Sequence, residues 1–315
     1  RVEAEGAVVL NGFELNLPKP ALKAGRPSSV NYDEHAPENT LLAWQPARGA
    51  TAHLLYLGTD SNAVAHATQS SPEFKGRLTE GKFTAGRLSH MNNSFWRVDE
   101  VHPGRTEPVG GDVWQFRPRF MAFPTAEGYG RFAIGGRGGR VIEVTNLDDS
   151  GPGSLRSAVE AEGPRTVVFN VSGLITLESK LVVKNPYLTI AGQTAPGKGV
   201  CVRKFNLGMM GAHDVIIRHL RVRPGNLAGL TLDGMGMASS DHCIIDHCSI
   251  SWTQDESFSS RGARNITLQR TLISEALNAA GHKKYPPGTQ HGYAASISGN
   301  VGSFHHNLLA HNAGR

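Results

Sequence analysis

The sequence has little cysteine, no long hydrophobic run and no dense basic run, and each shortage excludes a class of protein. Three cysteines among 315 residues are an odd number, which gives no framework of paired disulfides. No apolar stretch approaches the ~20 residues that a membrane-spanning helix needs, so we expect no membrane partner. The net charge is +5, but the lysines and arginines are dispersed. We therefore expect no nucleic-acid partner, and an acidic polymer fits the basic excess better.

Glycine, in contrast, is abundant, with 37 residues, and it is accompanied by 17 prolines. This composition indicates many turns and short strands rather than long helices. The hydrophobic fraction of 39% is sufficient for a packed core. At about 150 residues per domain, a chain of this length predicts two domains.

The N-terminal part of the chain predicts a linker followed by a small β-sandwich. Residues 1–34 have little pattern, whereas residues 35–119 contain short apolar or alternating runs that are separated by turns. Several short strands at such spacing are typical of a sandwich. The stretch resembles fibronectin type III modules, and the resemblance depends on Trp44 and residues 56–60, 95–98 and 114–116. We expect its aromatic residues to form the core rather than to bind sugar.

Residues 120–139 form a glycine-rich bridge to the second domain. The run 135–139 is similar to a phosphate-binding loop, but no clear strand precedes it and no helix follows it directly. A nucleotide site needs both of these neighbours, so we do not interpret the bridge in that way. Residues 153–160 predict one short amphipathic helix.

A weak internal repeat determines the fold expected for residues 120–315. Four related segments begin at residues 215, 243, 266 and 302, at intervals of 28, 23 and 36 residues. Large apolar residues occupy the third and the eighth position of every segment: Ile217, Ile245, Leu268 and Phe304, then Val222, Ile250, Ile273 and Leu309. No helix is expected between the segments, so the repeat does not suit a βαβ unit. It suits a parallel β-helix, in which each coil stacks on the last and buries a shared apolar interior.

Acidic residues lie next to the turns of this repeat. Asp233, Asp255-Glu256 and Glu275 each lie just before or after a predicted strand, so stacked coils would bring them together. Clustered carboxylates repel one another unless a cation is present, and a cluster of oxygen ligands favours Ca²⁺ over Zn²⁺. The alternative is that these residues are solvated turn acids, and the repeat favours the calcium site.

Histidine and cysteine recur in the same strands. Histidine at the fifth repeat position, in His219, His247 and His306, predicts a stacked, hydrogen-bonded ladder rather than a zinc site. The cysteines are expected to be buried free thiols. Cys243 and Cys248 are five residues apart, so we expect them on opposite faces of one strand.

The two longest motifs of the second domain resemble the strand-and-turn signatures of pectate lyases. The motifs are residues 244–252 followed by Asp255-Glu256, and residues 303–312 ending in Arg315, with further likeness at 191–197 and 291–293. The resemblance covers roughly residues 121–315. It implies an all-β protein with a right-handed parallel β-helix behind the sandwich. It also implies an enzyme, a polysaccharide lyase that cleaves polygalacturonate by calcium-assisted β-elimination.

The resemblance assigns roles to residues that match the family pattern. Asp233 and Asp255 match calcium-binding aspartates, and Arg315 matches the arginine that acts as the catalytic base. Calcium would offset the charge of the uronate carboxylate and stabilise the enolate-like transition state. Because the reference pKa of arginine is above 12, an alkaline optimum follows.

Two positions depart from the family pattern. The further acidic ligand of the family falls on Ser259, and the substrate-binding lysine of the best-known members falls near Ala276. We expect Glu275 to serve as the further metal ligand and Lys284 to bind substrate in their place.

Two alternatives to a pectate lyase stay open. One is a β-helix that binds acidic polysaccharide without cleaving it, and the other is a lyase that acts on a different uronate polymer. Pectate lyases usually continue with more coils after the catalytic arginine, so we expect a β-helix that is truncated at its C-terminus. The function implies a monomer that is secreted or periplasmic, although Arg1-Val2-Glu3-Ala4 is not a charged-then-apolar leader.

Overall fold

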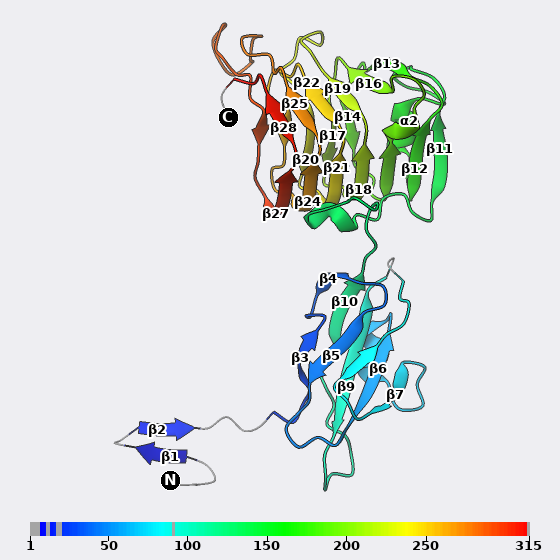
Figure 1. Ribbon diagram of the computed structural model, residues 1–315, viewed down its shortest axis with the longest axis vertical. Helices are drawn as coiled ribbons and strands as arrows, with labels where there is room; N and C mark the ends of the chain where they lie inside the picture. Colours follow the sequence, from blue (N-terminus) through cyan, green and yellow to red (C-terminus); the bar gives the residue numbers. More distant parts are fainter. Residues whose placement is uncertain (1–6, 11–12, 17–20, 90–91, 314–315) are drawn as a thin grey trace. The chain divides into compact units, whose positions relative to one another are not determined.

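The computed structural model describes residues 7–10, 13–16, 21–89 and 92–313, and the chain divides into two compact units, Arg1–Arg119 and Phe120–Arg315. Within these ranges both units consist mainly of β-strands, with two short α-helices, α1 (Ser61–His66) and α2 (Leu155–Glu160) (Figure 1). The predicted all-β class is confirmed. Within the described ranges, no helix has the length and apolar character that a membrane span requires.

The first unit contains a β-sandwich of two sheets, together with the antiparallel pair β1 (Ala7–Leu10) and β2 (Phe13–Asn16). The three-stranded sheet has the order β3-β5-β8, with β3 (Gly25–Ser28), β5 (Leu41–Gln45) and β8 (Lys82–Thr84). The five-stranded sheet has the order β4-β10-β9-β6-β7, with β4 (Asp33–Ala36), β6 (Ala52–Gly58), β7 (Phe74–Leu78), β9 (Ser94–Val101) and β10 (Trp114–Pro118). Strand β3 and the start of β4 lie within residues 1–34, which the sequence assigns to a linker. The finer likeness to fibronectin type III modules stays a prediction.

Three tryptophans form the centre of the sandwich core. The ring centroid of Trp96 lies 6.1 Å from that of Trp44 and 4.7 Å from that of Trp114. The three side chains belong to one apolar cluster with residues of both sheets and are buried. These aromatic residues therefore pack in the core, as expected, and present no platform for a sugar.

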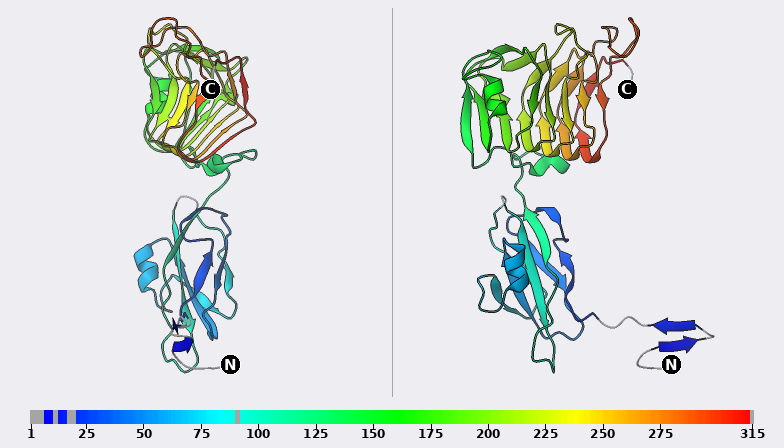
Figure 2. Two further views of the ribbon diagram at one scale, coloured as in Figure 1. Left: turned by 90° about the vertical axis from the view of Figure 1, so that its left-hand side faces the viewer. Right: turned by 180° about the vertical axis from the view of Figure 1, so that it is seen from behind.

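The second unit is a parallel β-helix of three parallel sheets, here called sheets I, II and III. The chain passes through one strand of each sheet in turn, and five full coils run from β12 to β26 (Figure 2). Sheet I contains β11 (Arg140–Val144), β12 (Arg165–Phe169), β15 (Leu188–Ala191), β18 (His213–Arg218), β21 (Asp241–Asp246), β24 (Arg264–Gln269) and β27 (Asn300–His305). Sheet II contains β13 (Gly173–Thr176), β16 (Val200–Arg203), β19 (Arg221–Arg223), β22 (Ser249–Ser251), β25 (Leu272–Ser274) and β28 (Leu308–Ala310). Sheet III contains β14 (Leu181–Val183), β17 (Leu207–Met210), β20 (Met235–Ala238), β23 (Phe258–Ser259) and β26 (Ala295–Ser296).

The strand register of the β-helix confirms the repeat that the sequence predicts. The third repeat positions are paired from strand to strand in sheet I, through Ile217, Ile245, Leu268 and Phe304. The eighth positions are paired in the same way in sheet II, through Val222, Ile250, Ile273 and Leu309. Six of these eight side chains are buried in one continuous core, which Phe304 packs against. Stacking of like apolar residues therefore sets the register.

The corner between sheets I and II is a single residue with a positive φ. His219, His247, Arg270 and His306 occupy it in successive coils, with φ between 49° and 56°. The rings of His219 and His247 stack at 4.9 Å, whereas Arg270 separates them from His306. The predicted histidine ladder is therefore present over two coils only.

This corner also corrects the prediction for two cysteines. Cys243 and Cys248 are both buried in the same core rather than on opposite faces of a strand. Strand β21 ends at Asp246, and the positive φ of His247 turns the chain before Cys248. The predicted free thiols are confirmed, since all three cysteines are unpaired and buried.

Most of the glycine-rich bridge, residues 121–136, forms a strap that crosses the outer face of sheet I. The strap contains the short 3₁₀ helix η1 (Tyr129–Phe132), and its amide at Gly130 donates to Thr267 Oγ1 at 2.9 Å. A Cβ at Gly130 would lie 2.2 Å from the carbonyl oxygen of Cys243, so only glycine allows this approach. The glycines of the bridge therefore serve close backbone packing on the β-helix.

Candidate functional site

The corner between sheets II and III differs from the first because it carries long loops. Residues 224–234, 252–257 and 275–294 connect the strands there in three successive coils. The loops are held to one another by backbone hydrogen bonds, for example from Gly234 N to the Glu256 carbonyl oxygen at 3.1 Å. Long loops on a rigid repeat are where binding and catalytic residues usually lie.

Three carboxylates converge at this corner. The ligand oxygens of Asp233, Asp255 and Glu256 lie within 4.8 Å of one another. Strands β20 and β23 pair Met235 with Phe258, so the positions two residues before them, Asp233 and Glu256, lie next to each other in neighbouring coils. Ser259 donates a 2.8 Å hydrogen bond to Asp233 Oδ2.

The environment of these acids opposes their charge. Burial, followed by the negative charge of Asp255, raises the pKa of Asp233 despite the hydrogen bond from Ser259. Burial and the neighbouring Asp255 raise the pKa of Glu256 to about 7. Burial alone would raise the pKa of Asp255, but hydrogen bonds with Glu256 and two histidines outweigh it and lower the pKa. The raised pKa of Glu256 therefore favours its protonated form, and a bound cation would favour the charged form instead.

Two histidines of the longest loop hold Asp255 in place. His291 Nε2 lies 2.9 Å from Asp255 Oδ1, and His282 Nε2 lies 3.3 Å from Asp255 Oδ2. Both rings are buried, and Tyr285 packs against them with ring centroids at 4.7 and 5.1 Å. Lys284 N donates to His282 Nδ1, so the Nε2 atom of His282 carries the proton that it offers to Asp255. The histidines therefore orient one carboxylate and fasten the loop.

The structure brings together two of the five predicted site residues. Asp233 and Asp255 lie in the carboxylate cluster, whereas Glu275 is exposed and its Oε1 lies 3.1 Å from His311 Nδ1. Lys284 is exposed in the long loop, two residues from His282. Arg315 lies outside the described residues.

Sequence reasoning places Glu256 among the acids near the turns but assigns it no role as a ligand, and it misses the two histidines. Glu256 stands beside Asp255 and was noted in the same dipeptide, and the strand register could have identified it. His282 and His291 are 27 and 36 residues from Asp255, and no periodic pattern links them to it. Only the path of the long loop brings them to the carboxylate.

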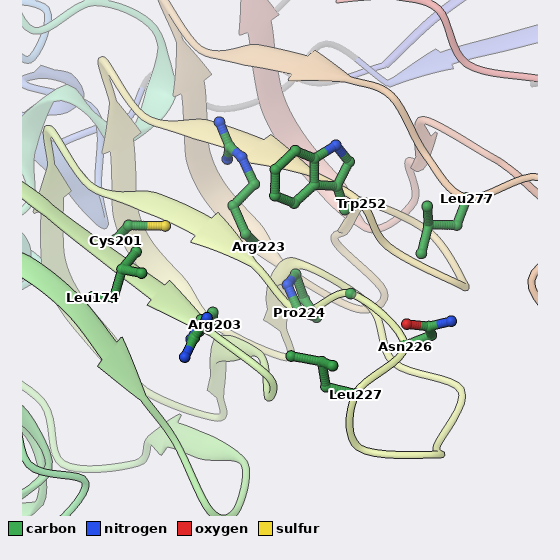
Figure 3. A pocket seen from close by; sticks show the side chains of 10 residues that line it. Leu174, Cys201, Arg203, Arg223, Pro224, Asn226, Leu227, Trp252 and Leu277 are labelled. Atoms are coloured by element: carbon green, nitrogen blue, oxygen red, sulfur yellow. The ribbon is translucent and has the colours of Figure 1, made fainter.

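A cavity of about 390 Å³ lies on the outer side of sheet II next to the same loops (Figure 3). Arg203 and Arg223 extend from β16 and β19 into it, and Trp252 forms one wall. The remaining wall is largely apolar and includes Leu174 and Leu227. This cavity is lined by cations, in contrast to the carboxylate cluster.

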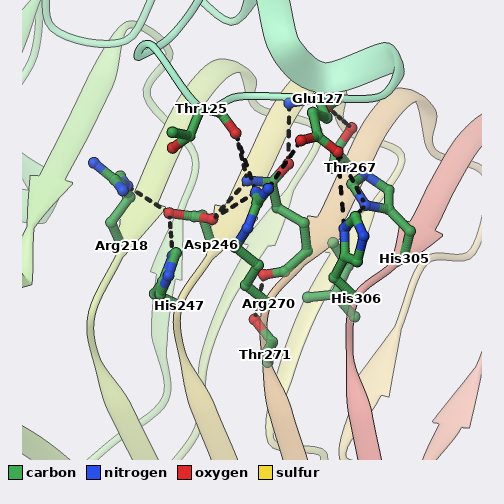
Figure 4. Close-up of polar contacts among 12 residues, drawn as sticks. Thr125, Glu127, Arg218, Asp246, His247, Thr267, Arg270, Thr271, His305 and His306 are labelled. Atoms are coloured by element: carbon green, nitrogen blue, oxygen red, sulfur yellow. Dashed lines mark hydrogen bonds and ion pairs between the residues drawn. The ribbon is translucent and has the colours of Figure 1, made fainter.

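A second polar cluster lies beneath the strap, and its acidic and basic groups form ion pairs with one another (Figure 4). Asp246 is completely buried, and it accepts hydrogen bonds from Arg218 Nε and Gln269 Nε2, both at 2.6 Å. Gln269 also bonds Thr125 and Glu127 of the strap. With every charge partnered, this cluster serves to fasten the strap to sheet I.

The chain is similar in sequence to curated pectate lyases. Over 158 residues it is 49% identical to "Probable pectate lyase C" of Emericella nidulans and 48% identical to that of Neosartorya fischeri, covering 50% of this chain and 37% of each relative. It is 35% identical over 160 residues to "Probable pectate lyase 4" of Arabidopsis thaliana, covering 49% of this chain and 41% of the relative. The chain thus spans less than half the length of these relatives. No family model matches it.

Two solved structures align with the chain. One is jun a 1, the major allergen from cedar pollen, at 20% identity and a TM-score of 0.41, covering 58% of this chain and 62% of that chain. The other is the pectate lyase Bsp165PelA from Bacillus sp. N165 in complex with trigalacturonate, at 17% identity and a TM-score of 0.39, covering 59% and 62%. At TM-scores below 0.5 neither alignment bears on function, and the parallel β-helix is established by the strand pairing itself.

Proposed function

We propose that this chain is part of a secreted polysaccharide lyase that cleaves polygalacturonate by calcium-assisted β-elimination. The observation that carries the proposal is the convergence of Asp233, Asp255 and Glu256 in a chain that is 49% identical to a probable pectate lyase over half its length. Three clustered carboxylates, two of which have pKa values raised by burial and by neighbouring negative charge, suit a hard cation such as Ca²⁺.

The residues of the corner have distinct roles in the proposed mechanism. Asp233, Asp255 and Glu256 would hold the cation, and His282 and His291 would orient Asp255. A bound calcium ion supplies Lewis acidity, which neutralises the C6 carboxylate of a uronate and makes the C5 proton more acidic.

The remaining steps of the proposed mechanism need a base and a substrate contact. Arg315 is proposed to remove the C5 proton, and Lys284 to pair with a substrate carboxylate. Elimination then forms the C4–C5 double bond, breaks the bond from C4 to the glycosidic oxygen, and leaves an unsaturated uronate, while the released oxygen takes a proton from water. Glu275 is proposed as a further ligand, although its partner His311 would have to release it.

A spectroscopic assay tests the proposal. Incubating the protein with polygalacturonate and calcium should produce rising ultraviolet absorbance from unsaturated ends, and a chelator should abolish the rise. Asp233→Asn should reduce the rate by at least tenfold, whereas the exposed Asp148→Asn serves as a matched control with the parent rate. The absence of product at neutral and alkaline pH, with and without calcium, would exclude the lyase.

A binding protein for acidic polysaccharide is the second candidate. Ser259, which occupies the position of a family acid and bonds Asp233, favours it because the cluster then has fewer acidic ligands. Calcium-dependent retention on polygalacturonate beads without release of unsaturated fragments would support binding alone. Release of such fragments from a different uronate polymer, but not from polygalacturonate, would identify another substrate.

A further inference from the structure

Parallel pairing places two arginines side by side on the outer face of sheet II. Strands β16 and β19 pair Arg203 with Arg223, and they also pair Cys201 with Arg221. Neighbouring strands lie about 4.8 Å apart, so the two guanidinium groups extend from adjacent rungs. Like charges directly opposite each other in a sheet are destabilising. An arrangement of this kind requires an explanation in terms of a counter-charge.

No carboxylate of the described residues supplies that counter-charge. Arg203 Nε donates to Thr176 Oγ1 at 2.8 Å, and Arg223 donates to Ser249 Oγ at 2.6 Å. Arg221 donates to the carbonyl oxygen of Lys198 at 2.6 Å. These partners are neutral, so they position the guanidinium groups without cancelling their charge. Thr176 lies in β13 and Ser249 in β22, so Arg203 and Arg223 extend along the sheet in opposite directions. In the part of the chain that the structure describes, none of the three arginines forms an ion pair.

The cavity beside these arginines has an aromatic wall. Trp252 is 51% exposed, and its ring lies 5.9 Å from the guanidinium carbon of Arg223 (Figure 3). Leu174 and Leu227, which also line the cavity, are exposed large apolar side chains. A volume of about 390 Å³ lies in the range of small-molecule sites, which run from about 300 to 1,000 Å³. The cavity thus combines an exposed aromatic face with unneutralised cations.

We propose that this cavity binds an acidic oligosaccharide, with its carboxylates on Arg203 and Arg223 and a sugar ring against Trp252. The planar guanidinium group matches a carboxylate with two parallel hydrogen bonds, which a point charge does not. The aromatic ring of Trp252 offers an apolar face to the C–H groups of a sugar ring. The choice of a uronate rests on the proposed function, whereas the anion site itself rests on the arginines.

The cavity is separate from the carboxylate cluster but lies on the same loop. Residues 224–234 begin next to Arg223, where Pro224 and Leu227 line the cavity, and end at the carboxylate cluster with Asp233. A polymer that engages both places would gain effective concentration from the second contact. The cavity therefore acts as an auxiliary subsite for the polymer rather than as a catalytic site.

Fluorescence of Trp252 provides the test, because the other three tryptophans are buried in the first unit. The intact chain is titrated with trigalacturonate in EDTA, and quenching by neutral acrylamide is measured. Trigalacturonate should protect Trp252 from acrylamide. Arg203→Gln should weaken this protection by about tenfold, the effect of one lost charge-assisted contact. Arg140→Gln, an exposed arginine on sheet I, should leave it unchanged.

Further probes identify the ligand class, and Arg223→Gln provides a second variant. Both variants should keep the far-ultraviolet circular dichroism and unfolding midpoint of the parent, which shows that they are folded. Equal protection by maltotriose would overturn the role of the arginines, and equal protection by inorganic phosphate would overturn the sugar. No protection by trigalacturonate, or equal protection in a folded Arg203→Gln, would overturn the proposal.

The experiments distinguish an error in the proposed lyase activity from an error in the proposed subsite. Because the titration contains no calcium, protection of Trp252 measures the subsite apart from the proposed calcium site. Protection of Trp252 without any unsaturated product would reject the lyase and leave the subsite. Unsaturated product without protection of Trp252 would reject the subsite and leave the lyase.

Discussion

Two regions of the β-helix shift the pKa values of their buried acids in opposite directions. Under the strap, burial alone would raise the pKa of Asp246, but hydrogen bonds from Gln269, His247 and Arg218 outweigh it and lower the pKa. At the corner between sheets II and III, burial and neighbouring carboxylates raise the pKa of Glu256 to about 7 and also raise that of Asp233. The region under the strap contains the cations that neutralise its buried acid. The corner instead places Asp233 and Glu256 beside another carboxylate.

The difference separates structural from functional polar groups. A buried charge that is fully partnered stabilises one arrangement of the chain, whereas clustered like charges cost stability until a ligand offsets them. Both like-charge groups of the β-helix described above, the carboxylate cluster and the arginines of sheet II, adjoin the same loops. This is the pattern expected where a protein binds a cation and an anionic polymer together.

Removing the structural carboxylate should have the largest effect on stability. Asp246→Ala removes the shared acceptor of the half-buried Arg218 and the buried Gln269 and should lower the free energy of unfolding by about 3–5 kcal/mol. Denaturant unfolding monitored by circular dichroism measures this. Asp246→Asn keeps the shape and one acceptor, so it should cost less. A change below about 1 kcal/mol in Asp246→Ala would show that the network does not fasten the strap.

Adding one methyl group to the strap at Gly130 should lower the free energy of unfolding. Gly130→Ala places a Cβ 2.2 Å from the Cys243 carbonyl oxygen, and the resulting displacement should cost about 1–3 kcal/mol. Gly208→Ala in β17 is the matched control, since its nearest neighbour would be an ordinary contact at 3.5 Å. Equal unfolding free energies for the two variants would mean that the strap is not closely packed.

Removing one carboxylate from the cluster should weaken calcium binding without lowering the stability of the fold. Asp233→Asn should weaken calcium binding by about tenfold or more in isothermal titration calorimetry, because one formal charge is lost from the ligand set. The unfolding midpoint in EDTA should not fall, since a like charge has been removed. Equal calcium affinity in variant and parent would show that the acids are solvated turn residues.

The smallest expected effect is on the pH dependence of the metal-free protein. Folding raises the pKa of Glu256 from 4.5 to about 7, so in this interval the folded state holds a proton that the unfolded chain has lost. Stability in EDTA should therefore fall as the pH rises through this interval. Glu256→Gln should remove that part of the fall, a difference on the order of a few degrees in Tm between about pH 5 and about pH 8.

Calcium provides the control for this pH experiment. At about pH 8 it should raise the Tm of the parent, because the cation replaces the lost proton. An unchanged slope of Tm against pH in Glu256→Gln would contradict the assignment of the raised pKa.

The coils of the β-helix could be predicted because stacking repeats a local pattern. Ile217, Ile245 and Leu268 were aligned from the sequence alone, and the strand register agrees with that alignment. The same pattern placed Asp233 and Asp255 near one corner. It failed for Cys243 and Cys248, because a turn at one positive-φ residue between them does not register in the apolar periodicity.

The sequence by itself therefore determined the stack: which residues face the core, which strands pair, and near which turns the acids lie. The tertiary structure alone decided which side chains meet across those turns. His282 and His291 reach Asp255, and Arg203 lies beside Arg223, through a loop path and a register that no local propensity encodes. Contacts between residues distant in sequence depend on loop geometry, and loops vary in length without changing the repeat.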